Sequence, residues 1–132
     1  KLQQPVQACR EAGGPMLALT GAHKYYFVEG VTDMRLGQYR LCKVVETLLH
    51  RNPYNGDTFI FMSKDRRVSK IVRYEYGKYI LYVIALERDL KFMKVVHKKP
   101  LANEDGTGVH YEIKWKQLVA LLSCPVRNII RI

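Results

Sequence analysis

Apolar residues recur at helical spacing in two parts of the chain, and each stretch predicts an amphipathic helix. The longer stretch lies within residues 36–50 and the shorter one within 113–122. We expect Thr32 or Asp33 to cap the first helix, since both side chains can accept a hydrogen bond from a first-turn amide. The apolar stripe of that helix comprises Leu41, Val44, Val45, Leu48 and Leu49. Such a stripe is typical of a helix that packs on a sheet.

Short runs of β-branched and aromatic residues, separated by turn residues, predict strands. The predicted strands are 24–28, 58–62, 70–75, 79–86 and 91–96. Gly77 and Lys78 supply a tight turn, so the third and fourth of these strands should form a hairpin. Residues 103–108 have the composition of a loop.

The order of these elements predicts an α+β fold with a mainly antiparallel sheet of four to five strands and two helices packed on it. The length of 132 residues suits one domain. Met16 is the first methionine, and the polar stretch before it contains Gly and Pro. We therefore expect a single domain over residues 16–132 and an N-terminal extension outside the fold over residues 1–15.

The charge balance is the first indication of function. The chain has 22 Lys and Arg against 12 Asp and Glu, a formal net charge of +10. An excess of this size favours polyanionic partners, nucleic acid first. A membrane surface, an acidic protein, or a basic surface with no specific partner remain as alternatives.

The densest basic stretch lies between two predicted strands, where Arg and Lys side chains could follow a phosphate backbone. A merely solvated turn is the alternative for that stretch. Tyr74, Tyr76, Tyr79 and Tyr82 could stack on unpaired bases or could belong to the sheet core. The predicted DNA-binding residues are Arg35, Lys64, Arg66, Arg67, Lys70 and Arg73. Further basic groups are Lys91, Lys94, Lys98 and Lys99, and Lys114 with Lys116.

The residues offer little for catalysis or for a metal. The four histidines are scattered singly, which is typical of surface or loop positions, and no CxxC pair occurs. Cys42 falls inside the predicted first helix, where a buried free thiol is expected. Two acid-x-Lys triplets, at Asp89 and Glu112, are the sole hint of nuclease chemistry, and chance explains such triplets. We therefore predict no catalytic residue, no cofactor and no metal, and a protein that is not an enzyme.

The sequence gives no sign of a membrane location. No apolar run approaches the ~18 residues that a membrane-spanning helix needs. The three widely spaced cysteines fit a reducing compartment. We expect a cytoplasmic protein without a membrane partner.

The block Thr32-Asp33-Met34-Arg35, followed by Leu36-Gly37, resembles the TnpB accessory proteins from the second open reading frame of insertion sequences of family sixty-six. The likeness runs from about Met16 to Leu122. Its other motifs are Asn52-Pro53 with Gly56, Phe59-Ile60-Phe61, the basic residues Arg66, Arg67 and Lys70, Gly77, Leu86-Glu87, and Gln117-Leu118 with Leu121-Leu122. Two departures stand out: Val83-Ile84-Ala85 replaces the usual Lys-Arg pair, and Phe92-Met93-Lys94-Val95 replaces an aromatic-x-Trp-Pro motif.

The resemblance implies an accessory role in DNA transposition beside a separate catalytic transposase. Our leading hypothesis is electrostatic DNA binding. We expect Arg35 to be an exposed cation in the first turn of the helix, and the alternative is an ion pair with Asp33 or a neighbouring acid. The alternative is an adaptor that docks the transposase or a companion transposition protein through exposed tyrosines. A metal-dependent nuclease is the third hypothesis, and association into a homo-oligomer is left open.

Overall fold

The computed structural model describes residues 23–31, 33–95, 100–123 and 125–127. In chain order its elements are β1 (Tyr25–Val28), α2 (Gln38–Leu48), β2 (Thr58–Met62), β3 (Val68–Glu75), β4 (Lys78–Ala85), β5 (Leu90–Lys91), β6 (His110–Ile113), α3 (Trp115–Ser123) and β7 (Val126–Arg127). Strands and helices are mixed along the chain, as an α+β fold requires. The expected extension at residues 1–15 lies outside the described residues and stays a prediction.

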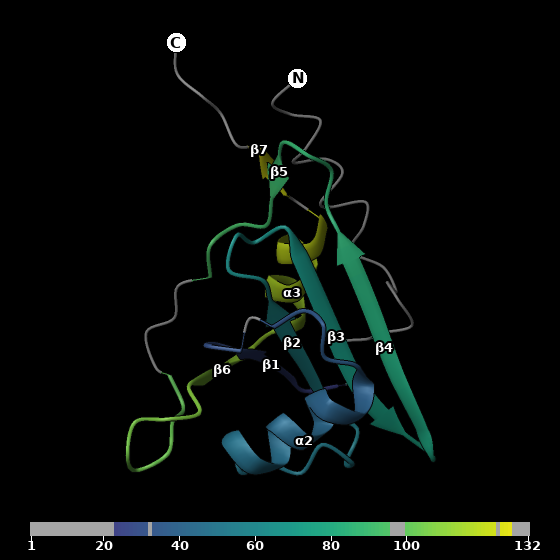
Figure 1. Cartoon of the computed structure of the whole chain (residues 1–132), viewed down its shortest axis with the longest axis vertical. Coiled ribbons are helices and arrows are strands. Elements are labelled where there is room, and N and C mark those ends of the chain that lie inside the picture. The colour runs from purple at the N-terminus through teal and green to yellow at the C-terminus, as the bar shows by residue number, and fades with distance from the viewer. Residues whose placement is uncertain (1–22, 32, 96–99, 124, 128–132) are drawn as a thin grey trace.

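Five strands form the main sheet in the order β4-β3-β2-β1-β6 (Figure 1). β1 and β2 are parallel and are joined through α2, while every other neighbouring pair in this sheet is antiparallel. The β3–β4 hairpin predicted around Gly77 is present, and it pairs Val68 with Ala85 at one end and Glu75 with Lys78 at the other. The expected mainly antiparallel sheet with two helices is therefore confirmed.

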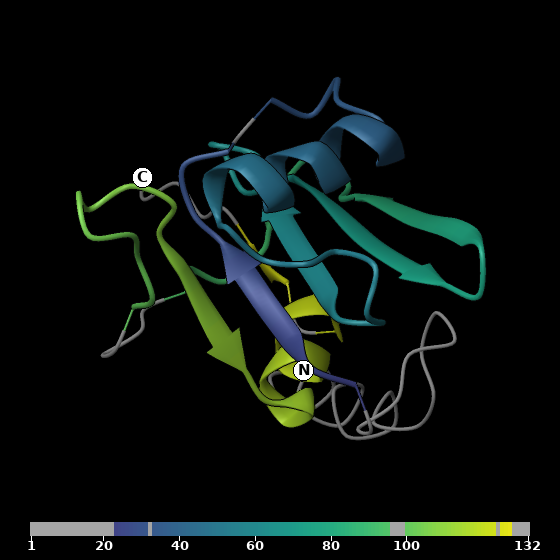
Figure 2. The ribbon, with the colours of Figure 1, turned by 90° about the horizontal axis from the view of Figure 1, so that it is seen from below.

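The helices cover opposite faces of the sheet, with α2 on one face and α3 on the other (Figure 2). Alternate residues of β2 point to the two faces, so Phe59 and Phe61 pack with α2 while Ile60 and Met62 pack with α3. All five residues of β2 are buried for this reason. The apolar stripe of α2 supplies Leu41 and Val45 to its side of the core, as the spacing predicted.

Two elements in the second half of the chain differ from the prediction: one strand is shorter, and the second helix is present but begins two residues later. The strand expected at 91–96 is limited to Leu90–Lys91, which pairs with β7, and residues 92–95 have no regular structure. Phe92 is instead fully buried, and its N–H donates to the carbonyl of Arg66. The helix expected from Ile113 begins at Trp115, because residues 110–113 form β6 at the sheet edge. Without a turn between β6 and α3, nothing in the local sequence separates the two elements.

The start of α2 also differs from the prediction. Gly37 occupies the N-cap position without a side-chain cap hydrogen bond, and Asp33 lies four residues before it. The carboxylate of Asp33 instead accepts hydrogen bonds from the backbone and side chain of Arg35. Thr32, the other predicted cap, lies outside the described residues. The first helical turn therefore retains backbone amides that no side-chain cap within the described chain satisfies.

The end of α2 is closed by the loop that precedes β6. The side-chain amide of Asn103 donates to the carbonyl of Leu48, at 2.9 Å, and to the hydroxyl of Thr107. Gly108 lies against the same carbonyl with φ of +67°, and a Cβ atom there would stand 2.2 Å from the Leu48 oxygen. This close approach requires glycine at position 108. No helix in the described parts of the chain is long and apolar enough to span a bilayer.

Candidate nucleic-acid interface

The predicted basic stretch forms the turn between β2 and β3, which we call the basic loop and define as residues 63–67. The hydroxyl of Ser63 accepts hydrogen bonds from the amides of Arg67 and Val68, at 3.1 and 3.0 Å, and donates to Asp65 at 2.7 Å. The bond from Ser63 and the amide of Arg67 lower the pKa of the Asp65 carboxyl. Arg66 takes a left-handed conformation with φ of +60°. The loop therefore holds its cations on a fixed backbone.

Backbone hydrogen bonds from the segment after β4 also fix the basic loop. The amide of Phe92 donates to the carbonyl of Arg66 at 2.7 Å, and the amide of Leu86 donates to the carbonyl of Arg67 at 2.8 Å. The bond from Phe92 brings the neighbouring Lys91 next to the loop, whereas the exposed Lys94 lies beside β6 and α3. From the sequence Lys91 belongs to a separate basic group, because only the tertiary structure joins it to the loop.

The cations of the basic loop differ in how free they are. Lys64 is exposed, while Arg66 and Arg67 are half-buried. The guanidinium of Arg67 lies 3.4 Å from the carbonyl of Leu86, and its buried Nε finds no hydrogen-bond partner among the described residues. Lys64 and Arg66 therefore have the freer charges, and Arg67 is partly committed to the fold.

Arg35 and Lys70 lie together at the start of α2. Arg35 forms a two-pronged ion pair with Asp33, at 2.9 and 3.1 Å, and its side chain is 90% exposed. The hydrogen bond from the Arg35 side chain lowers the pKa of Asp33 to about 2. Lys70 donates from Nζ to the carbonyl of Leu36 at 2.7 Å. Arg35 precedes the helix and does not belong to its first turn, which corrects the prediction and selects the ion-pair alternative.

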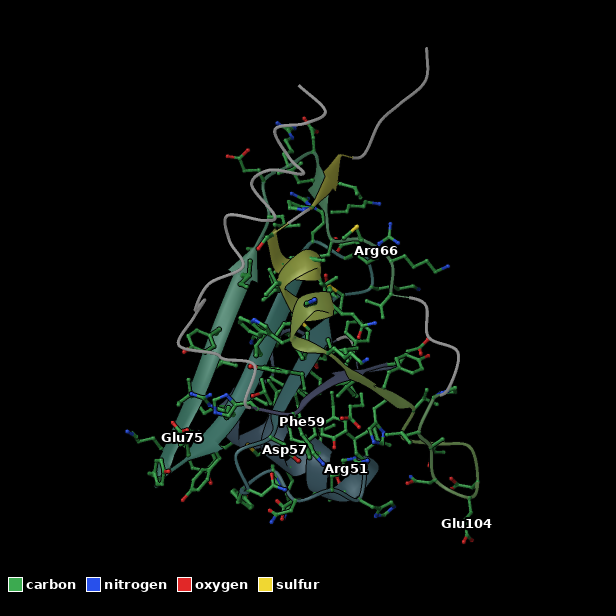
Figure 3. The ribbon with its side chains drawn as sticks, turned by 180° about the vertical axis from the view of Figure 1, so that it is seen from behind. Arg51, Asp57, Phe59, Arg66, Glu75 and Glu104 are labelled. Carbon is green, nitrogen blue, oxygen red and sulfur yellow. The ribbon has the colours of Figure 1, made fainter. Side chains whose placement is uncertain are left out.

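Arg73 lies apart from the other predicted DNA-binding residues. Its side chain is 3% exposed and faces the α3 side of the sheet, as Ile71 does. Nη1 lies 3.0 Å from Nε2 of His23, and Nη2 lies 3.5 Å from a carboxylate oxygen of Glu75. The alternation of side chains along β3 predicted that Arg73 shares a face with Ile71. It did not predict that Arg73 would be buried on that face. Figure 3 labels Arg66 and Glu75 well apart, on opposite sides of the view, and Arg73 lies two residues from Glu75 on β3.

A second group of side chains, three exposed and one half-buried, comes together from four separate parts of the chain. Rings of Tyr39 (α2), Tyr79 (β4), Tyr74 (β3) and Tyr54 (the α2–β2 loop) form a contiguous set, which we call the tyrosine row. Neighbouring centroids are 4.7 to 5.0 Å apart along the row, and each contact is edge-to-face. Sequence reasoning selected Tyr74 and Tyr79 but missed Tyr39 and Tyr54, because no local spacing links them to the hairpin. Tyr82 packs instead against the α3 side of the core.

Two surface hollows flank the tyrosine row. One, of about 470 Å³, lies between the α2–β2 loop and the tip of the β3–β4 hairpin; it is lined by His23, Lys24, Tyr54, Asn55, Gly56, Asp57, Tyr74, Glu75 and Tyr76. The other, of about 550 Å³, lies at the start of α2 and is lined by Asp33, Arg35, Leu36, Gly37, Tyr39 and Arg40. Each hollow combines aromatic surface with cations.

Cys42 and His110 occupy structural positions. Cys42 is buried in α2 as a free thiol, as predicted, and desolvation by burial raises its pKa to about 11. His110 is buried, contrary to the expectation of a surface histidine; its Nε2 accepts from Nε of Arg51 at 2.8 Å. Among the described residues, no group of three His, Cys, Asp or Glu side chains is arranged to hold a metal ion.

The family relationship of the chain agrees with this architecture. The family model described as IS66 Orf2 like protein matches residues 23–126. The match includes both helices and all five strands of the main sheet. Comparisons with curated proteins and with solved structures give no significant match.

Proposed function

Because this chain belongs to the IS66 Orf2-like family of accessory proteins of insertion-sequence transposition, we propose that it serves transposition by binding DNA. The resemblance found in the sequence is thereby confirmed. In this proposal the protein contributes binding and not catalysis, and it acts beside a separate transposase. The contact surface is the end of the sheet that carries the basic loop.

The observation that carries the proposal is the fixed presentation of several cations at one end of the sheet. Lys64 and Arg66 stand on a loop that is fixed by its own hydrogen bonds and by bonds from the amides of Leu86 and Phe92, and Lys91 adjoins it. A charged side chain on a fixed backbone loses less conformational freedom when it meets a phosphate. The formal net charge of +10 adds a long-range attraction to the same partner.

Arg35 and Lys70 extend this surface toward α2. Lys70 lies opposite Phe61 in the sheet register, close to the end of β2 where the basic loop begins. The first turn of α2 has no acidic residue, and no side chain in the described part of the chain caps it, so its amides and partial positive charge also favour an anion. We propose Arg35, Lys64, Arg66 and Lys70 as the main contacts, with Arg67 contributing less. Buried Arg73 is not part of this surface.

The test is the salt dependence of duplex binding, measured by fluorescence anisotropy of labelled DNA. The test variant combines Lys64→Gln with Arg66→Asn, because asparagine tolerates the left-handed backbone at position 66. We expect the slope of log affinity against log salt to fall by about two, roughly 0.9 for each phosphate that the variant no longer neutralises. A preference for the terminal inverted repeat over scrambled duplex would add recognition of the element's ends.

The matched control combines Lys114→Gln with Lys116→Gln at the start of α3. Both lysines are exposed, and the change in net charge is the same. An equal reduction of the slope in both variants would show that total charge, and not the basic loop, governs binding. Wild-type protein that fails to bind duplex DNA at low salt would overturn the proposal altogether.

A further inference from the structure

The tyrosine row leaves a large aromatic surface in solvent. Tyr39 is 65% exposed, Tyr54 41% and Tyr79 37%, and Tyr76 beside them is 89% exposed. A contiguous exposed patch of aromatic side chains is uncommon on a surface that binds nothing. Each edge-to-face contact covers one face of one ring, so the row keeps other ring faces available for stacking.

The backbone at the hairpin tip gives a second, independent sign. Tyr76 and Gly77 both have positive φ, of 51° and 76°, which makes them the two central residues of a type I′ turn. Asparagine is preferred at the first of these positions, and a bulky residue there is strained. A strained and nearly fully exposed tyrosine contributes little to folding stability, so it points to a role in binding.

The charges around the row favour an anionic partner. Three of the nearby carboxylates have partners within the described chain: Asp33 pairs with Arg35, Glu46 accepts from the hydroxyl of Tyr54, and Glu75 pairs with Arg73. Asp57 is the other carboxylate that lines the hollow next to Tyr54. The cations Lys24, Arg40 and Lys78 are exposed, and no ion pair within the described residues involves them. Lys24 and Arg40 each line one of the two flanking hollows.

The hollow next to Tyr54 also offers hydrogen-bonding groups to the edge of a flat ring. Asn55 accepts from the amide of Asp57 through its side-chain oxygen, which leaves its NH₂ group as a donor. The carboxylate of Asp57 can accept from a ring N–H, such as N3–H of thymine, or from an exocyclic amine. Aromatic walls with a few polar groups at the rim suit a nucleobase.

We propose that the tyrosine row and its two flanking hollows form a binding site for unpaired bases of single-stranded DNA. The row would stack on successive bases, while Lys24, Arg40 and Lys78 contact the phosphates between them. This inference rests on the proposed role in DNA binding, but it does not depend on the basic loop. This site would bind DNA through base stacking and cations together, whereas the surface proposed for the duplex would bind it through cations alone.

The test compares two labelled strands of about ten nucleotides, an oligothymidylate and a strand of equal length whose central sites are abasic. Both carry the same phosphates, so only base contacts distinguish them. We expect the wild-type chain to bind oligothymidylate about ten-fold or more tightly than the abasic strand. The double variant Tyr39→Ala with Tyr54→Ala should lose most of that ratio, and Tyr39→Phe with Tyr54→Phe should keep it, because phenylalanine preserves the rings.

Tyr76→Asn provides a variant that should not unfold the protein. Asparagine suits the type I′ turn, so we expect a higher Tm together with weaker binding of oligothymidylate. Val83→Ala, which removes an exposed apolar side chain on β4, is the matched control and should leave the ratio unchanged.

The inference would be overturned if the wild-type chain bound the two strands with equal affinity or bound neither of them. The proposed function would still be tested separately by duplex binding. A ratio that survives in the alanine variant would also overturn it, and would assign the row to a protein partner such as the transposase. Loss of duplex binding in the Lys64→Gln, Arg66→Asn variant with an unchanged ratio would support both proposals as separate sites.

Discussion

Single residues set the stability of the contacts between α2 and the loop before β6. Gly108→Ala should destabilise the fold by more than about 2 kcal/mol, since the added Cβ would clash with the carbonyl of Leu48 and disturb its bond from Asn103. Urea unfolding followed by circular dichroism measures the change. Gly106→Ala is the control, because its φ is also positive but its Cβ would meet open space. Equal destabilisation of the two variants would attribute the cost to backbone conformation alone.

His110 makes the same region sensitive to acid. Desolvation by burial lowers the pKa of His110 below the unfolded value of 6.5, and the bond from Arg51 to its Nε2 requires a neutral ring. The unfolded chain then binds more protons, so this residue's contribution to stability is present above pH 6.5 and is lost as pH falls toward the lower folded pKa. We expect the free energy of unfolding to drop between pH 7.5 and about 5.

The variant His110→Gln should flatten that pH dependence, although it starts from a lower stability. His50 is exposed at the end of α2, and His50→Gln is therefore expected to retain the wild-type profile. If the two variants showed the same profile, the acid sensitivity would have to come from another group.

At the scale of elements, the sequence predicted those structures whose signals are local. The apolar stripe of α2, the buried run of β2 and the Gly77 turn each lie within a few consecutive residues, and all three are present. β6 escaped prediction because its four residues become a strand through pairing with β1. The tyrosine row escaped in part for the same reason, since Tyr39 and Tyr54 meet Tyr79 only after α2 packs beside the hairpin.

The β2–β3 turn links folding to the proposed DNA contact. Ser63→Ala removes the acceptor of two backbone amides and should cost about 1–2 kcal/mol. Because the cations themselves remain, we expect a loss of duplex affinity smaller than that of the Lys64→Gln, Arg66→Asn variant. Differential scanning calorimetry and anisotropy measure the two effects. Thr47→Ala, whose hydroxyl donates to Lys43 within α2, is the control for removal of a hydroxyl, and it should leave affinity unchanged.

At the scale of the whole molecule, the basic loop and the hollow beside Tyr54 lie at opposite ends of β3, while Arg35 at the start of α2 belongs to both proposed surfaces. The basic loop precedes Val68, and the hollow beside the tyrosine row includes Glu75 at the other end. Eight residues of strand separate the two by roughly 25 Å. A net charge of +10 attracts DNA to both ends, but only a molecule with a duplex and an unpaired tail could occupy both.

A forked DNA therefore tests how the two sites work together. Once one site is occupied, the second binds at a high effective concentration, but only if the tail can reach it. At about 3.4 Å for each stacked nucleotide, a tail of roughly eight nucleotides spans the distance. We expect the affinity measured by anisotropy to change little for shorter tails and to rise near that length. The Tyr39→Ala, Tyr54→Ala variant should show no such rise. An affinity that increases evenly from the first unpaired nucleotide would instead mean that the tail binds beside the basic loop, and that the two ends of β3 act independently.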